Sequence, residues 1–280
     1  LVQPEELPID EPFSGELSAV GLSNGRQGVL SSSVQGGINN FKGFGWRAQG
    51  TLKRGGNLRT PNYFLDNTGL SEKNFSLAAG YVRKGFGVDL FYSTFDSKIG
   101  IFSGSHIGSL TDLLSVIKNG EPFVKSGFNY SIGRPQQNIK HQLIKAEAHY
   151  HFNDGNRLQW TIAQQLNNRN EYDLHTPRND SIAALNKPQL TFKLNTLTND
   201  LIWDHKPLAK KLVGQIGVST LYQYNLMSGR PLIPNFNQFN IGLFWIERYV
   251  SNGWKLESGV RYDYRTLTTH RFVGKSKVSN

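Results

Sequence analysis

Histidine is the residue type in this sequence whose spacing most directly suggests chemistry. His149 and His151 are two residues apart in the stretch "IKAEAHYHF", so on an extended strand they share a face and lie about 7 Å apart. His141 falls on the same face further along, and His106 lies in the glycine-containing segment "FSGSHIG". Because a neutral imidazole binds Zn, Cu, Ni or Fe, these four residues are candidate contacts for a metal, a metal complex or haem. The alternative, which we favour for each, is an ordinary polar residue of a wall or of a packed loop.

Two arginines occur in similar Gly-Arg-Pro settings, Arg134 in "IGRP" and Arg230 in "GRPLIPNF". A planar guanidinium can bind two oxygens of a carboxylate, phosphate or catecholate at once, so both residues are candidate ligand contacts. Glycine and proline also fix turn geometry, and the same arginines would then pack one loop against another. We favour the packing role for both.

Motifs that mark common catalytic centres give no support to an enzyme. The sequence has no G-x-x-x-x-G-K-[ST] phosphate loop and no H-E-x-x-H pair. The glycines of "KGFGVD" (84–89) lie between two expected strands and precede no helix that could receive a phosphate. We therefore expect a binding or transport protein, with no cofactor.

Along most of the sequence, apolar and polar residues alternate with a period of two. This pattern is typical of β-strands with one apolar and one hydrated face, and such strands would position the residues named above. In "WKLESGVRYDYR" (254–265), Trp, Leu, Val and Tyr alternate with Lys, Glu, Arg and Asp. The pattern predicts roughly eleven strands. One exception, "HIGSLTDLLSVIKNG" (106–120), has leucines at helical spacing and predicts a short helix capped by Ser109 or Thr111.

The expected connections between these strands alternate in length. After a first short turn at residues 23–25, tight joins near 39–40, 84–85, 153–155, 205–210 and 251–253 alternate with longer loops near 56–73, 101–138, 173–188 and 226–237. An antiparallel up-and-down sheet with tight turns at one rim and long loops at the other has this order.

Composition indicates which solvent each face meets. The chain has 280 residues, a net charge of +10, 38% hydrophobic and 12% aromatic residues, and no cysteine. Eleven strands closed around a dry core would enclose more space than so few aliphatic side chains can fill. The inverted arrangement, with the apolar face toward lipid and the charged face toward water, predicts a transmembrane β-barrel. Lys and Arg are scattered rather than clustered, which favours a solvated basic surface over a nucleic-acid partner.

Several stretches resemble, in order, the barrel of TonB-dependent outer-membrane receptors. They are "GNLRTPNYFLDNTGL" (56–70), "IGIFSGSHIGSLTDL" (99–113), "YSIGRPQQNIKHQLIKAEAHYHFND" (130–154), "NNRNEYDLHTP" (167–177), "GRPLIPNF" (229–236) and "LFWIERY" with "GWKLESGVRYDYR" (243–265). Such barrels have about 22 strands, so the resemblance implies a partial barrel, roughly half. Residues 1–13 are then expected to be a connector from an absent plug domain and residues 14–280 the N-terminal part of the barrel, without the closing strands.

The resemblance also implies function, location and partners. A receptor of this kind lies in the outer membrane of a Gram-negative cell, contacts its lipid, and imports a scarce ligand with energy delivered through TonB to the plug. The expected cargo is an iron–siderophore or other metal complex, ahead of haem, zinc, cobalamin and glycans. Two other classes stay open: a passive outer-membrane porin, and a soluble β-rich adhesin or sugar-binding module.

Overall fold

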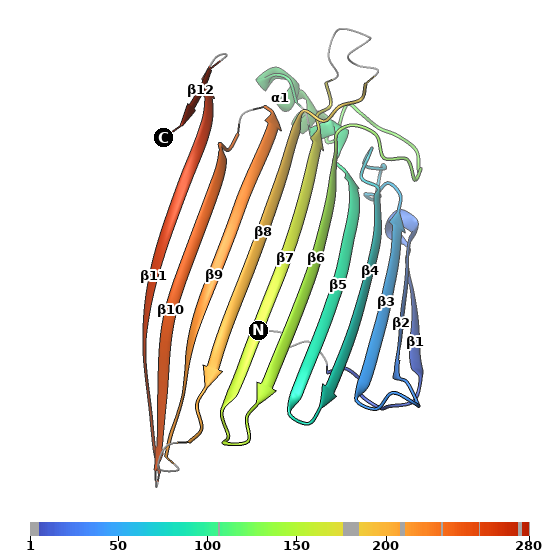
Figure 1. Cartoon of the computed structure of the whole chain (residues 1–280). Coiled ribbons are helices and arrows are strands. Elements are labelled where there is room, and N and C mark those ends of the chain that lie inside the picture. The colour runs from blue at the N-terminus through green and yellow to red at the C-terminus, as the bar shows by residue number, and fades with distance from the viewer. Residues whose placement is uncertain are drawn as a thin grey trace.

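The computed structural model of the chain describes residues 6–105, 107–175, 185–207, 211–230, 232–251, 253–273 and 276–279. Within these ranges it forms one antiparallel sheet with two short 3₁₀ turns and one α-helix (Figure 1). The strands are β1 (Ser14–Leu22), β2 (Gln27–Gly37), β3 (Phe44–Gly55), β4 (Leu70–Arg83), β5 (Phe86–Gly100), β6 (Gln136–His151), β7 (Arg157–Tyr172), β8 (Leu190–Asp204), β9 (Leu212–Gly229), β10 (Asn235–Ser251), β11 (Trp254–Val273) and β12 (Ser276–Ser279). The 3₁₀ turns are η1 (Asn24–Arg26) and η2 (Ser103–Ser105), and the helix is α1 (Leu110–Asn119).

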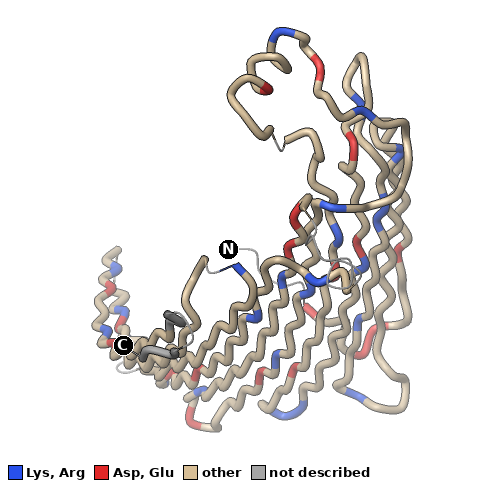
Figure 2. The backbone as a smooth tube through the Cα atoms, turned by 90° about the horizontal axis from the view of Figure 1, so that it is seen from above, with Lys and Arg blue, Asp and Glu red and all other residues tan. Residues whose placement is uncertain are grey.

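Strand order in the sheet is strand order in the chain, from β1 to β12. Each strand pairs antiparallel with its sequence neighbours, which confirms the predicted up-and-down arrangement of eleven strands and adds the short β12. The sheet curves into an open trough (Figure 2). No pairing in the described part of the chain joins β1 to β12, so the sheet is not closed.

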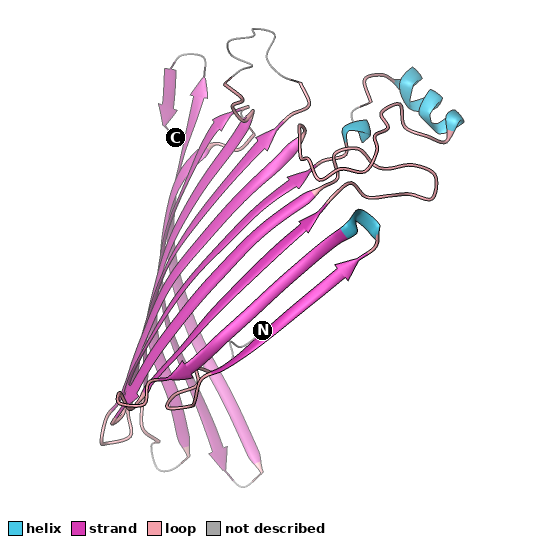
Figure 3. Ribbon diagram, turned by 90° about the vertical axis from the view of Figure 1, so that its right-hand side faces the viewer, coloured by secondary structure: helices cyan, strands magenta, loops and turns pink. Residues whose placement is uncertain are grey.

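The connections alternate between the two ends of the sheet. Strands are joined across 38–43, 84–85, 152–156, 205–211 and 252–253 at one end, hereafter the short-turn end, and across 23–26, 56–69, 101–135, 173–189 and 230–234 at the other, the long-loop end (Figure 3). The three longest connections, 56–69, 101–135 and 173–189, are all at the long-loop end, as predicted, whereas 23–26 and 230–234 are as short as the turns of the other end. The last loop is shorter than the predicted 226–237. One reason is that the Asn235 Oδ1 accepts a hydrogen bond from the Met227 N–H at 2.6 Å, which holds the ends of β9 and β10 together.

Helix α1 confirms the helical pattern within residues 106–120. The Ser109 Oγ accepts a hydrogen bond from the Asp112 N–H at 3.1 Å, so Ser109 rather than Thr111 is the N-cap. Gly120 ends the helix in the left-handed conformation, with φ of 69°. The loop with α1 extends over the concave side of the sheet (Figures 2 and 3). Across the described residues, every helix is too short or too polar to cross a bilayer.

Two neighbouring rows of cross-strand partners show how the two faces of the sheet differ. The first row crosses β3 to β11 and is apolar throughout: Phe44, Tyr81, Val88, Ala148, Trp160, Leu201, Val218, Leu243 and Tyr262. The second row, one residue along each strand and therefore on the opposite face, contains Gly45, Gly80, Asp89, Glu147, Thr161, Asp200, Ser219, Gly242 and Asp263. Alternation thus separates an apolar face from a polar one over nine consecutive strands.

The polar face is concave and the apolar face is convex. Residues 6–11 lie against the concave side, where Arg47 Nη2 donates to the Glu6 carbonyl at 2.9 Å and the Gly37 N–H donates to the Glu11 carbonyl at 2.7 Å. Figures 2 and 3 show the N-terminal segment inside the curve. The apolar side chains of the opposite face are open: Leu243 is 57% exposed and Tyr262 70%.

The apolar band stops before the long-loop end. A further row of the convex face consists of Lys73, Asp96, Lys140, Asn168 and Lys193, each the direct cross-strand neighbour of the next. Apolar side chains therefore predominate on the convex face between the short-turn end and this row, with amide side chains such as Gln164 and Asn199 among them, and the row itself is largely charged.

Candidate binding site

Two buried asparagines hold the loops 56–69 and 101–135 together at the long-loop end. Asn57 is fully buried: its Nδ2 donates to the Ser126 Oγ at 3.0 Å and to the Gly127 carbonyl at 3.2 Å. Asn67 Nδ2 donates to the carbonyls of Ile101 (2.9 Å) and Pro135 (2.6 Å), while its Oδ1 accepts from the Gly133 N–H at 2.8 Å. These bonds turn the loops into one packed layer.

Three arginines in this region lie over three aromatic rings. The Arg26 guanidinium is 4.1 Å from the ring centre of Phe128, and the Arg59 guanidinium is 5.5 Å from that of Phe64. Arg54, near the end of β3, lies 5.5 Å from the ring centre of Tyr130. The rings contact one another, with centres 5.9 Å apart for Phe64 and Phe128 and 5.0 Å for Phe128 and Tyr130. We call these six residues the arginine–aromatic cluster.

A pocket of about 460 Å³ opens between the turn η1 and the loop 56–69. Its lining includes Asn24, Arg26, Arg59, Thr60, Phe64 and Phe128. Part of the arginine–aromatic cluster therefore forms the wall of a recess large enough for a small molecule.

Backbone contacts fix the position of the cluster. The Asn24 side chain bonds both backbone groups of Arg59, accepting from its N–H at 2.7 Å and donating to its carbonyl at 3.1 Å. The Tyr130 hydroxyl donates to the Arg26 carbonyl at 2.9 Å. Gly56 allows the close approach of Phe128, because a Cβ at this position would lie 2.7 Å from the ring.

The charged groups of the cluster are all positive. Among the residues that the structure describes, no carboxylate pairs with Arg26, Arg54 or Arg59, and no other acceptor takes a hydrogen bond from their guanidinium groups. All three side chains belong to exposed residues. The region therefore presents three positive charges that attract anions.

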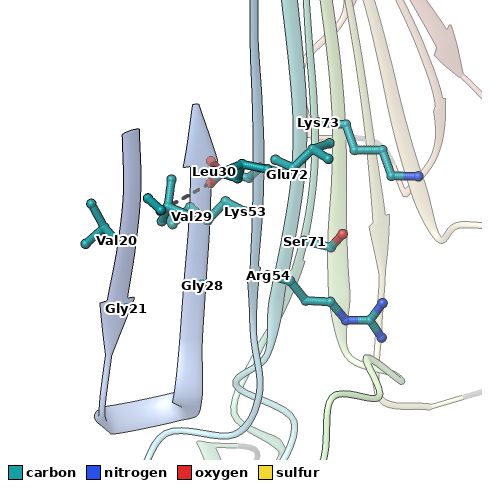
Figure 4. Close-up of a pocket in the computed structure, with 12 residues that line it drawn as sticks. Val20, Gly21, Gly28, Val29, Leu30, Lys53, Arg54, Ser71, Glu72 and Lys73 are labelled. Carbon is teal, nitrogen blue, oxygen red and sulfur yellow. Dashed lines mark ion pairs between the residues drawn. The ribbon is translucent and has the colours of Figure 1, made fainter. Parts of the chain in front are cut away.

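A second hollow, of about 610 Å³, is lined by residues of β1 to β4. Figure 4 shows Lys53 and Glu72 on one side of the strands and Arg54 and Lys73 directed to the other. Lys53 and Glu72 form an ion pair with 3.7 Å between Nζ and Oε1, so their charges offset each other. Seven of the twelve residues that line this open hollow are aliphatic or glycine, and the opposite charges of Lys53 and Glu72 are already paired.

The two arginines singled out from the sequence meet at one loop. All five N–H groups of the Arg134 side chain have protein acceptors: the Asn186 Oδ1, the Gln189 Oε1, and the carbonyls of Asp173 and Lys187. Its guanidinium also lies 5.1 Å from the ring centre of Tyr172. Arg230 reaches the same loop, with 3.5 Å between its Nη2 and the Asp173 Oδ2. The contacts match the favoured packing role, and only Arg230, whose side chain is 73% exposed, keeps much of its surface open.

The three predicted histidines that the structure describes are not brought together as a metal centre. His149 and His151 are neighbours on β6 near the short-turn end, with ring centres 5.4 Å apart. His141 lies further along the same face, with its Nδ1 3.3 Å from the Asn167 Nδ2. His106 lies outside the described residues. Within the described ranges, no group of three or more His, Cys, Asp or Glu side chains is arranged to hold a metal ion.

One sequence pattern looks catalytic until it is placed in the fold. Residues 21–25, "GLSNG", fit the G-x-S-x-G pattern of hydrolases, in which the serine lies between a strand and a helix. Here Ser23 lies in the turn between the antiparallel strands β1 and β2, followed by only the 3₁₀ turn η1. The strand-to-helix setting of a nucleophile is therefore not present at this serine.

The arginine–aromatic cluster was missed in the sequence because its members come from separate segments: η1, the end of β3, the loop 56–69 and residues 128–130. The available signals were an arginine close to aromatic residues in "NLRTPNYF" (57–64) and the two aromatic residues of "FNY" (128–130), which sequence reasoning did not connect. No protein-family model and no curated protein matches the chain.

Proposed function

We propose that the chain is part of the wall of a TonB-dependent outer-membrane receptor, which imports a scarce ligand, foremost an iron–siderophore or other metal complex. The short-turn end would face the periplasm and the long-loop end the outside of the cell. The concave face would line the lumen and the convex face would contact lipid.

The observation that carries this proposal is the pair of neighbouring rows, apolar on the convex face and polar on the concave face, across β3 to β11. These strands have between 12 and 20 residues. A membrane-crossing strand needs about 9–11 residues, whereas strands of water-soluble domains usually have about 3–10. Long strands with an exposed apolar convex face and a hydrated concave face suit a barrel in a bilayer.

The loop layer supports a receptor. The stretch 56–70, which resembles the receptor family, supplies Asn57 and Asn67 and so organises the loops at the proposed external end. Residues 6–11 on the concave face suit a segment that arrives from the lumen side. A passive porin would share the wall without needing an energised partner. A soluble adhesin or sugar-binding module would need another layer of protein over the convex face.

The test is cell fractionation with an antibody raised against residues 120–135, followed by uptake measurements. We expect the protein in the outer membrane, and uptake of iron chelates that is lost on deletion of its gene and on collapse of the proton gradient. Uptake that survives collapse of the gradient would favour the porin. A soluble protein at the 31.5 kDa of this chain would contradict the membrane proposal.

A further inference from the structure

The arginine–aromatic cluster places cationic groups in fixed positions without neutralising them. Arg26 lies over Phe128 and Arg59 over Phe64, and both line the same pocket. A guanidinium that stacks on a ring keeps its N–H edge free for hydrogen bonds in its own plane. Four arginines of the described strands each pair with a carboxylate, as Arg248 does with Glu257 at 2.7 Å, whereas the three arginines of the cluster have no such partner among the described residues.

Two kinds of contact orient the guanidinium groups of Arg26 and Arg59. The stacked ring sets the tilt of each, and a hydrogen bond fixes the backbone that holds it: Tyr130 on the carbonyl of Arg26, and Asn24 on both backbone groups of Arg59. Such pre-orientation lowers the entropy lost when a ligand binds. Solvated arginines of an ordinary surface have no comparable constraint.

We propose that the pocket between Arg26 and Arg59 is a binding subsite for a small molecule with at least two carboxylate or phosphate groups. Each arginine would hold one oxyanion through two N–H groups, and the charge of Arg54, over the adjoining ring of Tyr130, would add attraction. The volume of about 460 Å³ falls within the range of small-molecule sites, about 300–1,000 Å³. The subsite rests on the proposed function, because its position at the long-loop end makes it an early contact for anionic cargo.

The test uses the full chain in neutral detergent micelles and three probes: inorganic pyrophosphate, citrate and acetate. We expect saturable binding of pyrophosphate and citrate by calorimetry, and much weaker binding of acetate, which has one carboxylate. The double substitution Arg26→Gln/Arg59→Gln should weaken pyrophosphate binding about tenfold or more, because two charge-assisted contacts are lost. The control Lys42→Gln/Arg83→Gln removes the same charge at the short-turn end and should leave binding unchanged.

A second variant separates guanidinium geometry from charge and from folding. Arg26→Lys/Arg59→Lys keeps both charges but cannot bind two oxygens of one group with a planar fork, so we expect an intermediate loss of about threefold to tenfold. Equal binding by the wild-type chain and the glutamine variant would overturn the proposal. So would a loss in the Lys42/Arg83 control as large as that in the glutamine variant.

Phosphorylated lipid could supply the same oxyanion chemistry, so one arm of the experiment adds such a lipid to the micelles. Arginine-dependent binding of lipid, without binding of pyrophosphate or citrate, would overturn the assignment to a soluble ligand. Flotation of the chain with lipid vesicles is measured separately. A chain that binds pyrophosphate through Arg26 and Arg59 but does not float would contradict the membrane proposal and leave the oxyanion subsite standing.

Discussion

Asn57 shows how one buried side chain determines the shape of the loop layer. Its amide nitrogen donates to the Ser126 hydroxyl and the Gly127 carbonyl, and its oxygen accepts from the Thr68 N–H at 3.3 Å. In Asn57→Asp a second oxygen replaces the donor, so it would face the Gly127 carbonyl without a proton. We expect a loss of about 2–3 kcal/mol in the free energy of unfolding, measured by urea denaturation. Asn62→Asp, an exposed residue of the same loop, should change it by less than about 0.5 kcal/mol.

Arg134 and Arg230 allow a matched comparison of two arginines on one loop. Arg134→Gln removes the donors that hold residues 173 and 186–189, so proteolysis within the loop 173–189 should become several times faster. Arg230→Gln removes a single exposed ion pair of 3.5 Å and should change the rate little. The same cleavage rate in both variants would show that the Arg134 contacts do not order the loop.

His205, in the turn between β8 and β9, makes the stability of the fold depend on pH. A hydrogen bond with the Lys206 carbonyl, and a second with Glu247 at 3.0 Å, raise the pKa of His205 above its usual 6.5. A raised pKa means that protonated His205 stabilises the fold below about pH 6.5, and that this contribution disappears as the pH rises through the folded-state pKa. The melting temperature of the wild type should exceed that of His205→Gln by about 1–2 °C at pH 5.5 and by less at pH 8.5. A difference that grows with pH would contradict this assignment.

At the scale of elements, glycines of β3 and β4 let a second segment lie on the concave face. A Cβ at Gly80 would lie 2.7 Å from the Leu7 Cδ1 and would also meet the Asp89 carboxylate, and one at Gly45 would lie 3.0 Å from Pro8 and Ile9. A Cβ at Gly45 meets the backbone carbonyl of Pro8, so Gly45→Ala should displace residues 6–11 and make them more sensitive to protease, whereas the Leu7 and Asp89 side chains can move away from Gly80→Ala. Gly28→Ala is the control, because a Cβ there meets no atom within 4 Å and strands favour a side chain. If the N-terminal segment stays protected in Gly45→Ala, its packing does not depend on this glycine.

For the whole molecule, one arginine introduced on each face of the sheet tests whether the two faces meet different solvents. Leu243 of the convex apolar row pairs with Val218 of β9, and Ser219, the next residue of β9, belongs to the concave polar row. If the convex face contacts lipid as proposed, Leu243→Arg should lower the free energy of unfolding from lipid vesicles by about 2–4 kcal/mol, because a charge would meet hydrocarbon. Ser219→Arg should have a much smaller effect, because its side chain would face the hydrated concave side. Equal effects would contradict a lipid-facing convex surface.

The sequence by itself determined the period and the direction of the strands, and it predicted all of the described strands except the short β12. In β6 and β11, alternation alone assigns each residue to a face, because successive side chains of a strand point to opposite sides whatever its neighbours are. It also placed the short and long connections and the helix after Ser109, since turn residues and caps act within a few positions. The length of the β9–β10 loop was less well predicted, because its end depends on a bond between Asn235 and Met227 across the hairpin.

Only the tertiary structure decided which loop residues meet. Tyr130 bonds the backbone of Arg26 from 104 positions away, and Arg134 and Arg230 converge on Asp173 although they belong to different loops. Such contacts depend on strand register and on buried amides such as Asn67, which local sequence patterns do not encode. The direction of curvature was decided in the same way. Alternation distinguishes an apolar from a polar face, and in the paired sheet the polar face, with residues 6–11 against it, is the concave one.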